Sequence, residues 1–100
     1  MDTETTKKII GLVFKSVREE LGISRSALAK KVGVGVSCLR HFEQGTRNIK
    51  LKTLFALMHG LRIPMETVFN AMEKALKNPE EWLAEYELRA SQGNQEKFSK

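Results

Sequence analysis

The sequence contains one cysteine, Cys38, and only two prolines among its 100 residues. A single thiol excludes an internal disulfide and a thiolate zinc cage, and it fits a reducing cytoplasm. No apolar run approaches the roughly 18 residues that a membrane-spanning helix needs. The first four residues, MDTE, lack the basic-then-apolar order of a signal peptide. We therefore expect a soluble cytoplasmic protein that makes no membrane contact.

The sequence also has little of what an enzyme needs. Its two histidines, His41 and His59, have no acidic or cysteine neighbour at the spacing of metal ligands, so we expect no metal site. It contains neither a glycine-rich phosphate loop nor a nucleophile elbow. These absences indicate a protein that is not an enzyme and that needs no cofactor.

Positive charge is plentiful but unevenly distributed along the chain. The whole sequence carries a formal charge of +5. Residues 1–64 hold twelve Lys and Arg against five Asp and Glu, whereas residues 65–90 hold three against six. This distribution favours contact between the front of the chain and a polyanion, and leaves the acidic rear for solvent or another protein.

The apolar pattern predicts six helices and no strand, because apolar residues recur every three to four positions and never alternate for long. Ser24 is a good N-cap for the second helix, and Pro64 and Asn78-Pro79 mark the starts of the last two. Glycines are the expected stops of the first four helices. The predicted helices cover residues 6–21, 25–32, 36–44, 51–59, 64–77 and 79–90.

The third predicted helix has one buried side and one polar side. Leu39 and Phe42 mark the buried side, so Ser37, Arg40, His41 and Gln44 point away from the core by rotation, with Val36 at the leading edge. A short helix with hydrogen-bonding groups on one outward face is suited to reading base edges in the DNA major groove. The alternative is that these residues form an ordinary solvated face.

Residue types at a set of spaced positions resemble a known family. Residues 10–63 are similar to the lambda-repressor-like, XRE-type helix-turn-helix family of phage repressors, Cro proteins and bacterial regulators. The sequence departs from that family at Arg25, Gly35 and Ile49, where the family favours Gln, Ser or Thr, and Pro. The matching residues are Ile10-Gly11, Phe14, Val17-Arg18, Gly22-Ile23-Ser24, Leu28-Ala29, Val32-Gly33-Val34, Leu39, Glu43, Gly45, Thr53-Leu54 and Leu61.

The resemblance implies an all-α, five-helix lambda-repressor-like DNA-binding domain over residues 6–77, here followed by an additional C-terminal helix, 78–91, and a flexible tail, 92–100. It implies a sequence-specific regulator of transcription, more often a repressor, that binds double-stranded operator DNA as a dimer. It places base contacts at Arg25, Val36, Ser37 and His41, to which the outward face of residues 36–44 adds Arg40. The expected phosphate contacts are Ser24, Gln44, Arg47, Asn48, Lys50 and Lys52.

Two charged residues interrupt apolar faces, Arg18 on the first helix and Glu43 on the third. The resemblance implies that they form a structural ion pair across the core. Arg25 lies in the first turn of the second predicted helix, where a cation is unfavourable because it opposes the helix macrodipole. A phosphate or a guanine would offset that cost, and the alternative is a tolerated surface residue.

The rear of the chain is rich in large apolar residues. They suggest a homodimer interface, since such side chains are enriched in interface cores; the alternative is that the last helix folds back and buries Trp82 on its own domain. A third possibility is that the same helices bind another protein, such as the toxin of a toxin–antitoxin pair, with the chain acting as an antitoxin or adaptor. The expected interface residues are Met72, Leu76, Trp82, Leu83 and Tyr86.

Overall fold

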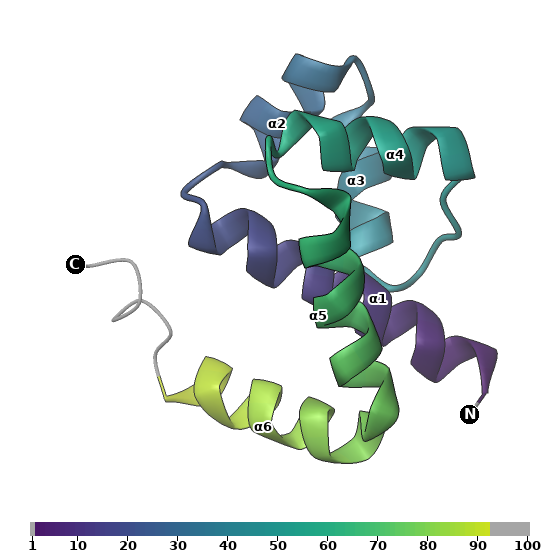
Figure 1. Cartoon of the computed structure of the whole chain (residues 1–100), viewed down its shortest axis with the longest axis vertical. Helices are drawn as coiled ribbons and strands as arrows, with labels where there is room; N and C mark the ends of the chain where they lie inside the picture. The colour runs from purple at the N-terminus through teal and green to yellow at the C-terminus, as the bar shows by residue number, and fades with distance from the viewer. Residues whose placement is uncertain (1, 93–100) are drawn as a thin grey trace.

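A computed structural model describes residues 2–92 of the chain and confirms the all-α class (Figure 1). Within these residues every regular element is a helix. Residues 93–100, most of the predicted tail, lie outside the described residues. The six helices are α1 (Thr3–Glu20), α2 (Arg25–Val32), α3 (Val36–Gln44), α4 (Leu51–Gly60), α5 (Met65–Lys77) and α6 (Pro79–Ser91).

The helix starts follow the capping chemistry in most cases. Ser24 caps α2 as predicted, and its Oγ accepts a hydrogen bond from the backbone N–H of Ala27 at 3.0 Å. Asp2 does the same for α1 by accepting from Thr5, so α1 begins three residues earlier than the apolar pattern predicts. Asn78 was expected to cap α6, but its side chain makes no capping bond, and Pro79 alone marks the first turn.

The sequence predicted that Gly60 follows the end of α4. In the structure Gly60 is instead the last helical residue of α4. A Cβ at this position would lie 2.5 Å from Cγ1 of Val32 and 3.0 Å from Cδ1 of Leu28. The absent side chain therefore lets α4 approach α2 closely. The chain reverses instead at Arg62, the one non-glycine residue in the described part of the chain with a positive φ (61°).

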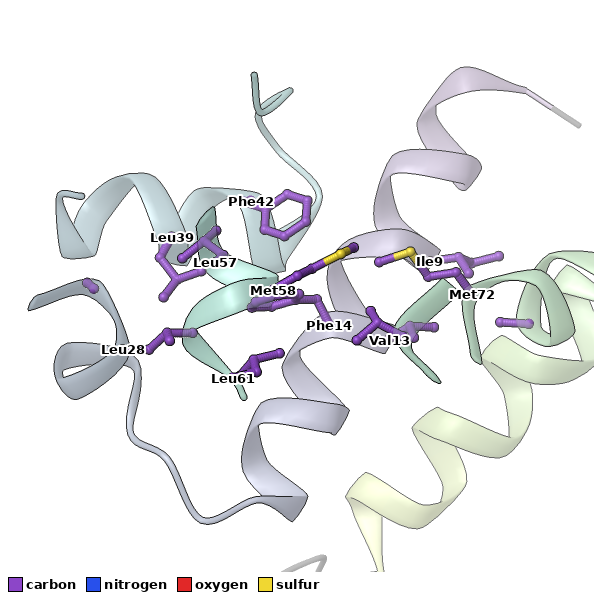
Figure 2. Close-up of a cluster of buried hydrophobic side chains, with 13 residues drawn as sticks. Ile9, Val13, Phe14, Leu28, Leu39, Phe42, Leu57, Met58, Leu61 and Met72 are labelled. Carbon is purple, nitrogen blue, oxygen red and sulfur yellow. The ribbon is translucent and has the colours of Figure 1, made fainter. Parts of the chain in front are cut away.

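α1 lies at the centre of the domain and packs against α3 and α5, while α2 packs against α3 and α4. Side chains from these helices meet in one core, in which Figure 2 shows Phe14, Phe42, Leu57 and Met58 converging. The rings of Phe14 and Phe42 meet edge to face with centroids 5.4 Å apart. Burial of this apolar surface fixes the position of α2 and α3 on the rest of the domain.

α6 lies at the opposite end of the molecule from α2 and α4 (Figure 1). It packs against α5 and α1, with Trp82 and Leu83 half-buried against the core. The described helices include none that is both long enough and apolar enough to cross a membrane.

Candidate nucleic-acid interface

A tight turn joins α2 to α3. Gly33 ends α2 with φ 79° and ψ 31°, a left-handed conformation that glycine adopts without steric cost. The backbone N–H groups of Gly33 and Val34 both donate to the carbonyl oxygen of Ala29, at 2.9 and 3.0 Å. These bonds reverse the chain within three residues, so α3 leaves the turn as a separate helix that packs against α2.

α3 has the two-sided character that its sequence predicts. Leu39, Phe42 and Glu43 are buried. On the other side Ser37 and Gln44 are exposed, Arg40 and His41 are half-buried, and Val36 at the first position is 40% exposed. The predicted reading residues of α3 therefore share an accessible face.

Two polar contacts order that face. Arg40 Nη2 lies 3.4 Å from Ser37 Oγ, one turn back along the helix. The second contact joins His41 Nδ1 to Thr46 Oγ1 at 3.3 Å, and both the N–H and the hydroxyl of Thr46 donate to the carbonyl oxygen of His41. Thr46 thus fixes the end of α3 to the following loop. Sequence reasoning passed over this residue, although it directly follows Gly45, the left-handed C-cap.

The loop after α3 places a group of donors beside the helix. All four predicted phosphate-contacting residues of this segment, Arg47, Asn48, Lys50 and Lys52, are exposed. Lys50 is also the N-cap residue of α4 and Lys52 lies in its first turn. Ser24 is exposed at the other edge of the site, with its hydroxyl oxygen already engaged in capping α2.

Beneath this face lies the buried pair of Arg18 and Glu43. Arg18 donates twice to the carboxylate, from Nε to Oε2 at 2.7 Å and from Nη2 to Oε1 at 3.0 Å. Its Nη1 donates to the carbonyl oxygen of Ile23 at 2.7 Å. Arg18 is 4% and Glu43 1% exposed, and no buried polar side-chain atom within residues 2–92 lacks a partner. The pair thus joins α1, the segment before α2 and the end of α3.

Arg25 belongs to the same network, which the sequence reasoning missed. Its Nε lies 3.1 Å from Oε1 of Glu43, and its side chain is 29% exposed. The charge that offsets this cation in the first turn of α2 is therefore a carboxylate of the protein itself. Of the base-reading residues expected from the sequence, Arg25 alone is bound to the core, and its role in reading DNA stays a prediction.

The expected interface residues of the rear are mostly used by the domain itself. Met72 is 6% exposed and lies in the core, which corrects the expectation that it forms part of an interface. The reason is that α5 lies across α1, so this face of the helix is covered. Leu76, Trp82 and Leu83 pack partly against the same core, and Tyr86 stacks on Trp82 at 5.4 Å. α6 thus packs partly on its own domain, and the role of Leu76, Trp82, Leu83 and Tyr86 in a homodimer interface stays a prediction.

Comparison with known proteins agrees with the geometry of α2, the turn and α3. The model of a family described as helix-turn-helix matches residues 14–68. Antitoxin HipB of Escherichia coli K12 is 35% identical over 51 residues, which are 51% of this chain and 58% of that protein. HipB of E. coli O6:H1 gives the same identity over 54% of its length. The chain thus spans little more than half the length of the curated relatives it matches.

Two solved structures resemble the whole domain. The restriction-modification controller protein C.Esp1396I, solved as a tetramer in complex with its natural 35-base-pair operator, is 26% identical with a TM-score of 0.65, over 69% of this chain and 91% of that one. The clp gene regulator ClgR from Corynebacterium glutamicum has a TM-score of 0.67 at 24% identity, over 86% and 93% of the two chains; at that identity the likeness concerns the fold.

Proposed function

Because this chain belongs to the helix-turn-helix family, we propose that it is a sequence-specific DNA-binding regulator of transcription, acting as a repressor, that places α3 in the major groove of operator DNA. The observation that carries the proposal is the accessible polar face of α3, which a short turn sets apart from α2 and which the core holds from behind. A helix held in this way is what major-groove reading requires. The operator-bound state of the similar controller protein supports the same use of the fold.

The side chains of the site divide by the part of DNA that they suit. Arg40 can donate two parallel hydrogen bonds to a guanine, Ser37 can donate to or accept from a base edge, and Val36 can pack on a thymine methyl group. The exposed donors after α3, such as Arg47 and Lys50, suit phosphate oxygens. Contacts of the first kind set sequence preference, and those of the second set affinity and its dependence on salt.

The proposed dimer interface lies on α4 and α5 rather than on α6. Leu51 is 65%, Phe55 39% and Phe69 42% exposed, and the rings of Phe55 and Phe69 meet edge to face at 6.5 Å. Leu51 and Phe55 are one turn apart on α4, so the three side chains form one apolar patch. Two-fold pairing through this patch would give the protein two reading helices for two half-sites, and it accounts for exposed aromatic surface that the domain itself does not use.

We also propose that the protein is not an enzyme. The family and fold are those of regulatory DNA-binding proteins, and we propose that the protein acts by occupying DNA in the cytoplasm, with no cofactor and no membrane contact.

The experiment that tests the function is the selection of bound duplexes from a random pool by the purified full chain. The expected result is enrichment of one motif with two related halves, centred about one helical turn apart. Recovery of a pool with no enriched sequence would contradict sequence-specific binding. A single unrepeated motif would retain specificity and contradict the dimer.

A second candidate is an antitoxin or adaptor that works through its C-terminal helices, and the similarity to HipB favours it. Deletion of residues 79–100 separates the two functions. In the regulator, the deletion removes a helix that is distant from the reading face and leaves DNA binding through α3. In the adaptor, the same deletion abolishes binding of the protein partner, for which co-purification with the product of a neighbouring gene is the measurement.

A further inference from the structure

A groove with a volume of about 720 Å³ opens on the molecule where α2 and α4 end and the chain turns toward α5. It lies along the C-terminal half of α4, from Ala56 onward, whereas the loop with the proposed phosphate-contacting donors precedes the N-terminal end of that helix. The groove is thus separate from the proposed DNA-contacting face. Its lining residues are Lys31, Val32, Ala56, His59, Gly60, Arg62, Ile63 and Met65.

The lining of the groove combines aliphatic and cationic side chains. Val32, Ala56, Ile63 and Met65 supply aliphatic surface. Lys31 and Arg62 supply two positive charges, and none of the described residues that line the groove is acidic. A ligand that fits would present an apolar side chain beside carboxylates.

One of the two cations, Lys31, is held in place by a backbone group. Lys31 Nζ donates to the carbonyl oxygen of Gly60 at 2.8 Å, which ties it to the C-terminal end of α4. Arg62 follows at the left-handed turn, with an exposed side chain. The lining thus contains one lysine that a hydrogen bond fixes and one arginine with an exposed side chain.

The same chain carries a surface with the complementary pattern. Trp82 and Leu83 turn α6 toward the core, so Glu81, Glu85 and Leu88 share the outward side of this helix by their spacing of four and three residues. Both glutamates are exposed and Leu88 is 56% exposed. One apolar side chain thus stands beside two carboxylates on an otherwise unused helix face.

We propose that the groove binds the outward face of α6 from a second copy of this protein. Leu88 of one molecule packs on the aliphatic lining residues of the other's groove, and Glu81 and Glu85 face Lys31 and Arg62. The ends of α2 and α4, whose residues line the groove, lie at the opposite end of the molecule from α6 (Figure 1). The contact is therefore head to tail and leaves a free groove and a free α6 at the ends of every pair. Such a contact extends association beyond a dimer, and on DNA it would link neighbouring bound molecules.

The test is sedimentation of the full-length protein without DNA, at rising concentration and low ionic strength. We expect the average mass to pass beyond that of a dimer and to fall back as salt screens the charges. The groove variant Lys31→Glu/Arg62→Glu and the helix variant Glu81→Lys/Glu85→Lys are each expected to weaken this step by at least about tenfold, because like charges then meet. An equimolar mixture of the two variants restores association, since each variant carries a surface complementary to the other's.

Lys30→Glu and Glu66→Lys are the matched controls, because both residues are exposed and lie outside the groove and α6; they should leave the step unchanged. Three results would overturn the proposal: a protein that stays at or below dimer mass under all conditions, equal effects of the controls, or no rescue in the mixture. None of these measurements involves DNA, so their failure would leave the proposed function standing.

Discussion

Arg18 on α1 and Glu43 on α3 form two parallel hydrogen bonds, at 2.7 and 3.0 Å, inside the core of the domain. The Glu43 side chain has no exposed surface, and the Arg18 side chain is 5% exposed. Both charges have therefore given up most of their hydration, for which the bonds between them compensate, together with the bond from Arg25 to Glu43. The pair fastens the end of the reading helix to the central helix.

Glu43→Ala is expected to lower the free energy of unfolding by about 3 kcal/mol or more, because it leaves a buried arginine without its partner. Chemical denaturation monitored by circular dichroism measures the change. Arg25→Ala serves as the comparison: this arginine contacts the same carboxylate but is 29% exposed, so we expect a loss of about 1 kcal/mol or less. Equal losses in the two variants would contradict the buried character of the pair with Arg18.

Gly11→Ala is expected to destabilise the protein by about 1–3 kcal/mol. Gly11 lies where α1 crosses the end of α3, and a Cβ there would overlap the carbonyl oxygen of Phe42 and lie 2.9 Å from that of Glu43. Backbone atoms cannot move aside as a flexible side chain does. Gly35→Ala is the control, because its Cβ would meet nothing within 4 Å and its φ is −70°. Gly35 is the N-cap of α3, where Ala is less favourable than Gly, and the lower entropy of the unfolded chain offsets part of that cost, so we expect a loss of less than about 1 kcal/mol. Thermal unfolding of the two variants measures the difference, and an equal loss of stability in both would contradict the close contact at Gly11.

Asp2 should show its capping role in its titration. The hydrogen bond from the backbone N–H of Thr5 lowers the pKa of this carboxyl below its ordinary value of 3.8. Because the folded value is the lower one, the stabilisation of the first turn of α1 is complete above the unfolded value and disappears as the pH falls through the folded value. NMR titration of the side-chain carbon is the measurement. A midpoint at or above 3.8 would show that the cap does not form in solution.

The apolar patch of Leu51, Phe55 and Phe69 predicts the effect of one charge on self-association. Phe69→Glu should weaken the proposed dimer by at least about tenfold, because a charge would be buried at the centre of the contact. Leu21→Glu is the control, since Leu21 is also exposed, at 42%, but lies at the end of α1. Sedimentation at high salt measures dimerisation through this patch alone, because salt screens the charges of the proposed head-to-tail contact of α6. An unchanged dimer in Phe69→Glu would place the interface elsewhere.

Much of this fold could be predicted from the sequence because its signals are local. Ser24, Gly33 and Gly45 mark helix ends through their own hydrogen bonding and backbone conformation, so the bounds of α2 and α3 agree with the prediction. The outward face of α3 followed from the helical period alone. Asp2 was a local signal too, but it precedes the apolar stripe and was not used.

The remainder depends on contacts between distant residues. Nothing near Arg25 in the sequence indicates that Glu43, eighteen residues later, offsets its charge. Likewise, apolar residues at a helical period show that α5 has a buried face, but not whether α1 or another molecule covers Met72. Gly60 was interpreted as a stop because glycine often ends helices, whereas its role is to admit the side chains of Val32 and Leu28.

The central claim is that α3 reads base sequence while the neighbouring loop holds the phosphates. Affinity for the selected duplex and for a random duplex of equal length, at about 150 mM salt, tests it most directly. The account predicts a preference of roughly a thousandfold or more for the selected duplex. Arg40→Ala should reduce that ratio of affinities by about tenfold or more. Lys50→Ala should lower the affinities for both duplexes alike, and should reduce the slope of log affinity against log salt concentration by about one. Equal binding of the two duplexes by the unaltered protein would contradict the account.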